Sequence, residues 1–140
     1  MSEEKQPAEL DISLLLRINE FKIADELCTC PSYFYTVSSL SVEAEDMYEA
    51  ATTAIETYEV QLAASYKAID EDVKETHIKR QYRADPKWNE LKKQQNKVHK
   101  QWKLLTKAAL AFEMKSKMLM SLNRRDLFKR GQVEGNIIND

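Results

Sequence analysis

An apolar residue recurs every three or four positions from Trp88 to Leu119, and this repeat constrains the fold more than any other feature of the sequence. Gln95 and Ser116 occupy the two polar gaps, so the spacing continues for over four heptads. Such spacing predicts a long amphipathic helix that buries one stripe against another helix. The apolar members of the stripe are Trp88, Leu91, Val98, Trp102, Leu105, Ala109, Phe112 and Leu119.

The residues that flank this stripe mark the ends of the predicted helix. Asp85 suits the N-cap and Pro86 the first helical position. Gly131 suits a C-terminal stop. We therefore predict a helix over residues 86–130 and a flexible tail over residues 132–140.

A second stripe of the same kind lies earlier in the chain. Ser41 suits an N-cap, and the acidic residues that follow it favour a helix start because they complement the helix dipole. This pattern predicts a helix over residues 42–82. Its stripe consists of Ala51, Ile55, Tyr58, Leu62, Tyr66, Ile69 and Val73.

The N-terminal part predicts one shorter helix, over residues 9–27, with Leu10, Leu14, Ile18, Phe21 and Leu27 at mostly helical spacing. Pro31 has no backbone N–H to donate, so we expect the helix to end near it. Residues 31–40 are aromatic and β-branched without a helical stripe, and we expect them to form a connecting loop.

Together these elements predict an all-α fold, with a short N-terminal helix and a long antiparallel helical hairpin in one domain over residues 1–131. Only 2 Gly and 3 Pro occur in 140 residues, as expected for long helices. A lone hairpin buries one stripe per helix, which is little support for so long a chain. We therefore expect the hairpin to form a homo-oligomer through its helical seams.

Charge is distributed unevenly along the chain. Residues 1–73 contain 4 Lys or Arg against 16 Asp or Glu, a balance of −12. Residues 74–140 contain 17 Lys or Arg against 7 Asp or Glu, a balance of +10. Such asymmetry indicates either a polyanionic partner or self-association.

The sequence offers little for catalysis or metal binding. Two glycines cannot build a Gly-rich phosphate loop. His77 and His99 lie in no metal-binding pattern, and we expect both to be solvated. Cys28 and Cys30 have no second Cys/His pair to complete a zinc site. We therefore expect no enzyme activity, no cofactor and no metal.

The sequence also carries no membrane or secretion signal. No run of 18 apolar residues occurs, and the acidic N-terminus lacks the apolar core of a signal peptide. The two closely spaced cysteines suit a reducing compartment. We expect a cytoplasmic protein.

The basic second half predicts a nucleic-acid site. Glu90 is the only acidic residue in 86–112, among seven lysines. A row of cations binds phosphates without reading sequence, and an aromatic ring near it can stack on bases. A solvated helix face is the simpler interpretation of the same pattern. The candidate binding residues are Lys74, Lys79, Arg80, Tyr82, Arg83, Lys87, Lys93, Lys97 and Lys100. The tryptophans fit the apolar stripe and are assigned to packing.

The layout resembles the UvsY-type recombination mediators of tailed bacteriophages. The matching features, in order, are an acidic amphipathic helix, a linker, a helix entered through residues 48–51, a basic aromatic stretch with Ala84-Asp85, and a last helix with residues 102–105 and 115–117. The resemblance implies a ring-like homo-oligomer that binds single-stranded DNA in the cytoplasm of a phage-infected bacterium. It also implies partners, namely a RecA-like recombinase and single-strand-binding protein, with the DNA contacts among Lys74, Lys79, Arg80 and Arg83.

Two other functions remain open. A structural helical adaptor would use both charged halves for protein contacts and would ignore nucleic acid. A small inhibitor would mimic DNA with its acidic first half.

Overall fold

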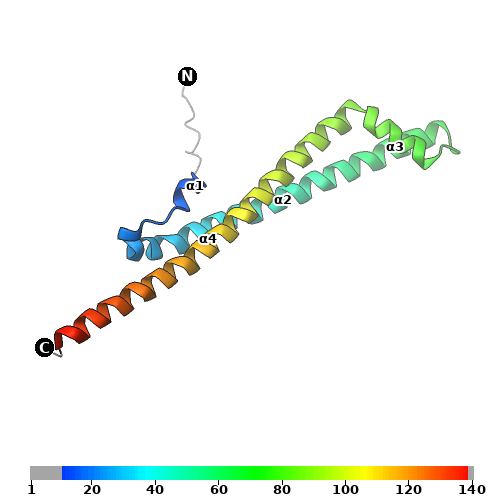
Figure 1. The fold of residues 1–140 in the computed structure, drawn as a ribbon. Coiled ribbons are helices and arrows are strands. Elements are labelled where there is room, and N and C mark those ends of the chain that lie inside the picture. The colour runs from blue at the N-terminus through cyan, green and yellow to red at the C-terminus, as the bar shows by residue number, and fades with distance from the viewer. Residues whose placement is uncertain (1–10, 139–140) are drawn as a thin grey trace, which may run out of the picture. The chain divides into compact units, whose positions relative to one another are not determined.

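The computed structural model describes the backbone of residues 11–138 and the side chains of residues 11–131. Throughout this range the structure contains helices and no strand, which confirms the all-α prediction. The elements, in order, are α1 (Ile12–Leu15), a 3-10 turn η1 (Glu20–Lys22), α2 (Ile23–Ile69), α3 (Glu75–Ala84) and α4 (Pro86–Ile138) (Figure 1).

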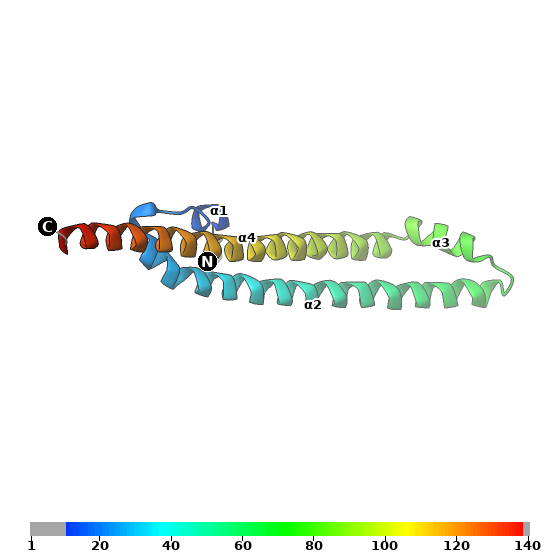
Figure 2. The same ribbon diagram turned by 60° about the horizontal axis from the view of Figure 1, so that its bottom comes forward.

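The described residues group into two compact units that share the long helices. Unit 2 is continuous, residues 39–106, and unit 1 combines the segments before and after it. In each unit a segment of α2 packs antiparallel to a segment of α4, as predicted for a helical hairpin (Figure 2). Both units are built from parts of α2 and α4, so this division does not test the prediction of one domain over residues 1–131.

Contacts between α2 and α4 fix the register of unit 2. The Tyr48 and Trp102 rings stack with centroids 5.5 Å apart. Further along, Gln95 Nε2 donates to Thr52 Oγ1 at 3.0 Å. Val98 and Ile55 are buried in the same seam. The tryptophan therefore packs within the hairpin, as its place in the stripe predicts.

The predicted helix over residues 42–82 is wrong at its C-terminal end, because α2 ends at Ile69 and the chain reverses there. Asp70 Oδ1 accepts a hydrogen bond from the Asp72 amide at 3.0 Å. A short acidic side chain that bonds its own backbone in this way competes with helical hydrogen bonds. Ile69, assigned to the buried stripe, is instead 86% exposed.

After this turn α3 runs back beside α2, so α3 belongs to the returning arm and not to the outgoing one (Figure 1). Ile78 of α3 is buried, and Tyr82 donates its hydroxyl to the Glu59 carbonyl at 3.0 Å. The boundary between α3 and α4 is a break within the returning arm. The hairpin turn itself lies at residues 70–74.

The start of α4 agrees with the prediction. Pro86 is its first residue, and Asp85 Oδ1 accepts from the Trp88 amide at 2.9 Å. The Tyr58 hydroxyl donates to the same carboxylate oxygen at 2.9 Å. Asp85 therefore caps α4 and ties it to α2.

The end of α4 differs from the prediction, because the helix continues through Gly131 to Ile138. A flexible tail over residues 132–138 is therefore wrong, and residues 139–140 lie outside the described range. A glycine terminates a helix by adopting a left-handed conformation. Gly131 has no positive φ, so it continues the helix at the modest cost of a helical glycine.

In unit 1, the predicted stop at Pro31 and the connecting loop over residues 31–40 are also wrong. Both lie inside α2. Ile23, Cys30 and Val37 are buried at seven-residue spacing, a seam that the isolated N-terminal sequence does not reveal. An internal proline costs a helix about 3 kcal/mol. Burial of this apolar seam against α4 offsets that cost.

The predicted helix over residues 9–27 is divided in the structure into α1, η1 and the first turn of α2. The Asn19 side chain accepts from the Phe21 amide at 3.0 Å and so starts η1 separately. Phe21 is 98% exposed, although its spacing placed it on a buried face.

A buried lysine holds this N-terminal segment in unit 1. Lys115 Nζ donates to the carbonyls of Leu15 at 2.5 Å and Arg17 at 3.1 Å, and it pairs with Glu26 Oε1 at 3.2 Å. The second oxygen of Glu26 accepts from the Asn19 amide at 3.0 Å. One cation therefore joins the segment before α2 to both long helices.

Candidate nucleic-acid interface

Three of the predicted site residues form a row on α4 in unit 2. Lys93, Lys97 and Lys100 follow one another at i, i+4 and i+7, and all three are exposed. The intervening seam residues Gln95 and Val98 are buried. The lysines thus lie on the side of α4 that does not pack against α2, as the stripe predicts.

Four further predicted cations lie on or next to α3. Lys74 precedes the helix, and Lys79, Arg80 and Arg83 belong to it. All four are exposed. We call these four residues and the three α4 lysines the basic surface.

Within the described side chains, no cation of the basic surface forms an ion pair. Within residues 11–131, the ion pairs shorter than 4.0 Å involve other cations, namely Lys115, Lys117 and Arg125. Exposed and uncompensated cations can neutralise phosphates, and the release of the counterions condensed on the nucleic acid then drives binding.

Tyr82 and Lys87, the other two predicted residues, are engaged with α2. Partial burial raises the pKa of the Tyr82 phenol, and the nearby carboxylates of Glu59 and Glu75 raise it further. Its hydroxyl is bound to a backbone carbonyl, so the ring anchors α3 and is not a free stacking platform. Lys87 Nζ lies 4.8 Å from the centroid of the Tyr58 ring, a cation–π contact.

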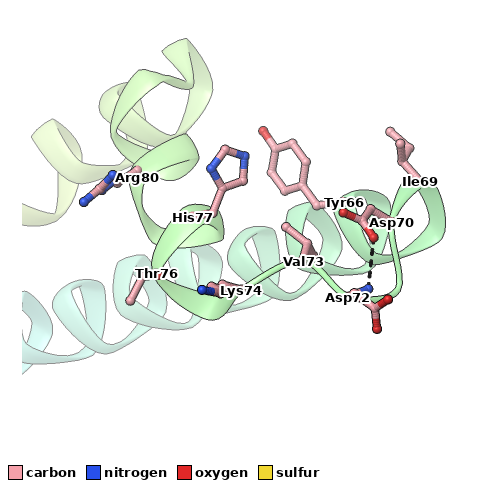
Figure 3. A pocket seen from close by; sticks show the side chains of 9 residues that line it. All are labelled: Tyr66, Ile69, Asp70, Asp72, Val73, Lys74, Thr76, His77 and Arg80. Atoms are coloured by element: carbon pink, nitrogen blue, oxygen red, sulfur yellow. Dashed lines mark hydrogen bonds between the residues drawn. The ribbon is translucent and has the colours of Figure 1, made fainter.

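A pocket of about 520 Å³ lies at the turn between α2 and α3, next to part of the basic surface. We call it the turn pocket. Figure 3 shows the Tyr66 ring from α2 and the His77 ring from α3 on the same side of the turn, with Ile69 beyond Tyr66. The lining residues are Tyr66, Ile69, Asp70, Asp72, Val73, Lys74, Thr76, His77 and Arg80.

The sequence pattern placed only two of these lining residues, Lys74 and Arg80, in the candidate site. Tyr66 was assigned to the buried stripe, and His77 to a solvated face. The signal that would have located the pocket is the Asp70–Asp72 turn, because it moves the reversal of the chain to residues 70–74.

The opposite side of unit 2 is acidic. Glu43, Asp46, Glu49 and Glu56 of α2 are exposed, whereas Ala44 and Ile55 between them are buried. We call these four carboxylates the acidic face. The contacts of Tyr48 and Thr52 with α4 place this stretch beside the lysine row along the hairpin. Unit 2 therefore has opposite charges on the outer sides of α2 and α4.

The remaining candidates for chemistry are structural or isolated. His99 is half-buried against Tyr48, with centroids 4.8 Å apart, so its prediction as a solvated side chain is wrong. Cys28 is exposed, whereas Cys30 is buried and lies 3.6 Å from the Phe112 carbonyl oxygen. Burial raises the pKa of the Cys30 thiol. Within the described residues, no group of three or more His, Cys, Asp or Glu side chains is placed to hold a metal ion.

Within the described part of the chain, none of the helices has both the length and the apolar character needed to cross a membrane. No protein-family model, curated protein or solved structure matches the chain. The assignment to UvsY-type mediators therefore stays a prediction from sequence pattern.

Proposed function

We propose that unit 2 binds single-stranded DNA through the basic surface, without reading its sequence. The observation that supports this most is the set of seven exposed cations, six on α3 and α4 and Lys74 just before α3, that have no carboxylate within ion-pair distance in residues 11–131. A helix surface that serves only solubility mixes its charges. Here the acidic face lies on α2 and the basic surface on α3 and α4.

Homo-oligomerisation is part of this proposal. A single basic surface of seven residues is a weak site, but several sites in one assembly hold a strand together with much higher avidity. The acidic face of one copy is complementary in charge to the basic surface of the next. A ring is the closed form of such head-to-tail contacts.

The biological role that we propose is mediation of recombination, in which the oligomer helps a RecA-like recombinase to replace single-strand-binding protein on DNA. This role rests on the resemblance of the sequence pattern to UvsY-type mediators. The chemistry of the site supports only the DNA-binding step.

The test is fluorescence anisotropy of a labelled 30-nucleotide single strand, titrated at several salt concentrations. We expect the triple variant Lys93→Gln, Lys97→Gln and Lys100→Gln to bind about tenfold or more weakly than the wild type. Its log–log salt slope should be shallower by about 0.7 for each phosphate that the variant no longer neutralises.

A matched control removes the same number of charges elsewhere. The triple variant Lys67→Gln, Lys117→Gln and Lys129→Gln also changes three exposed lysines, and none of them belongs to the basic surface. If both triples lose affinity equally, net charge and not the basic surface carries binding. If a helical wild-type sample binds no strand at low salt, the proposed function is wrong.

A second candidate function, the helical adaptor, is favoured by a different observation. Leu110, Met114 and Met118 follow one another at i, i+4 and i+8 on α4 and are 56%, 70% and 58% exposed. An apolar row of this kind suits a protein contact. The adaptor predicts that Met114→Lys disrupts assembly and that the wild type binds no single strand at any salt concentration.

A further inference from the structure

We infer that the turn pocket receives one base of a bound single strand, while the neighbouring cations hold its phosphates. This inference rests on the proposed function and deepens it, because it assigns a part of the strand other than the backbone to a defined site. Its evidence is the juxtaposition of aromatic, apolar and cationic side chains at residues 66–80.

The size and lining of the pocket suit a planar, partly apolar ligand. A volume of about 520 Å³ lies within the range of about 300–1,000 Å³ typical of small-molecule sites. Tyr66 and His77 supply two rings from different helices, which is the kind of platform on which bases stack. Ile69 adds apolar surface and is 86% exposed, so the hydrophobic contact it could make is unused within this chain.

The charges around the pocket match a nucleotide in two separate ways. Lys74 and Arg80 line it and belong to the basic surface, so cations lie close to the phosphates next to an inserted base. Asp70 also lines it. One of its carboxylate oxygens accepts from the Asp72 amide, and the second remains as an acceptor among the described hydrogen bonds.

A carboxylate at this position favours bases that carry an exocyclic amino group. Aspartate accepts a hydrogen bond from cytosine N4, whereas thymine presents carbonyl oxygens at the corresponding positions. The basic surface itself does not distinguish bases, so we expect every single strand to bind and the pocket to add a moderate preference for oligo-dC over oligo-dT at neutral pH.

The test compares a labelled 30-nucleotide oligo-dC with a strand of equal length in which every residue is abasic. Both strands carry the same phosphates, so the basic surface acts equally on both. We expect the wild type to bind oligo-dC about 5- to 150-fold more tightly than the abasic strand, the range that stacking of one base would give.

Two exposed pocket residues allow the site to be removed without unfolding the chain. The double variant Ile69→Ala and His77→Ala changes side chains that are both exposed. It should bind the abasic strand like the wild type and lose the preference for oligo-dC. Val60→Ala is the control, since Val60 is 69% exposed on α2 and does not line the pocket.

The outcomes separate this inference from the proposed function. If the wild type binds both strands equally well, the pocket holds no base, although the basic surface still binds DNA. If the double variant keeps the preference, the base is held elsewhere. If the wild type binds neither strand, the proposed function and the pocket assignment both fail.

Discussion

Lys115 is only 8% exposed, although lysine side chains are rarely buried. Three oxygens surround its ammonium group, two of them backbone carbonyls of the segment before α2. Removing the cation leaves these acceptors and the Glu26 carboxylate unpaired in a desolvated site. Breaking a buried ion pair from one side costs about 3–5 kcal/mol.

We therefore expect Lys115→Met to lower the free energy of unfolding by about 3 kcal/mol, measured by urea denaturation followed by circular dichroism. Lys117→Met is the control, because Lys117 pairs with Glu113 on an exposed surface where such pairs contribute about 0–1 kcal/mol. Adding Glu26→Gln to Lys115→Met should recover part of the stability. Equal effects of the two single variants would show that the buried network does not stabilise the fold.

Helical spacing places Lys115 on one face with Phe112 and Leu119, but its residue type favours solvent. It lies in a stretch with Lys117, and both suit a solvated surface. The structure separates them because Lys115 lies one residue before Ser116 of the apolar stripe and faces the N-terminal segment. That segment's path depends on Asn19 and Glu26, a tertiary arrangement that helical spacing does not encode.

Asp85 determines where the returning arm of unit 2 divides into α3 and α4. Its carboxylate accepts from the Trp88 amide and from the Tyr58 hydroxyl. The hydrogen bond from Trp88 is the main cause that lowers the pKa of Asp85, with smaller contributions from Tyr58 and Lys87. A carboxyl whose pKa is lower in the folded state stabilises the fold above its ordinary pKa of about 4.

This contribution disappears as the pH falls through the lowered pKa of Asp85. We expect the wild type to melt at a higher temperature than Asp85→Asn at pH 6, and the difference to shrink towards pH 3. Thermal melts of both proteins across this range test it. Asp85→Ala should melt below Asp85→Asn at every pH, since alanine also loses the cap acceptor. A wild-type advantage that is constant with pH would contradict this role of the carboxylate.

At the scale of elements, the sequence predicted the end of a helix correctly where the residues at that end and the apolar stripe agree. The start of α4 has both, a capping Asp85 followed by Pro86 and an unbroken repeat. The end of α2 has conflicting signals, because the apolar stripe continues through Ile69 to Val73 while Asp70 forms a local turn. At Pro31 the local signal was the misleading one, since burial of Cys30 and Val37 keeps the helix continuous.

The parts of the candidate site differ in the same way in how far the sequence predicts them. The lysine row on α4 follows directly from the stripe, because residues opposite a buried seam are exposed. The turn pocket depends on where the chain reverses. Its Tyr66 and His77 rings come together only because residues 70–74 form the hairpin turn.

At the scale of the whole molecule, the separated charges predict how copies associate. We expect the wild type to form a homo-oligomer whose mass by sedimentation velocity decreases as salt increases, since screening weakens contacts between exposed charges. The triple variant Lys93→Glu, Lys97→Glu and Lys100→Glu should dissociate. Adding Glu43→Lys, Glu49→Lys and Glu56→Lys to it should restore the assembly, because both faces are then reversed.

Recovery of the oligomer is the decisive result, because a variant with six substitutions that merely misfolds would not regain the wild-type mass. Circular dichroism of each variant serves as the control for folding. If the first triple keeps the wild-type mass, the contact between copies lies on other residues, and the apolar row of Leu110, Met114 and Met118 becomes the next surface to test.

The hairpin turn coincides with the position at which the chain changes sign, since the acidic half ends at residue 73 and the turn covers residues 70–74. Folding therefore converts a charge difference along the chain into one across a pair of helices. Within residues 39–106 this gives an electric dipole with a component that points from α2 to α4. A dipole in this direction experiences a torque near any polyanion. Unit 2 would thus turn its lysine side towards a DNA strand before the two touch.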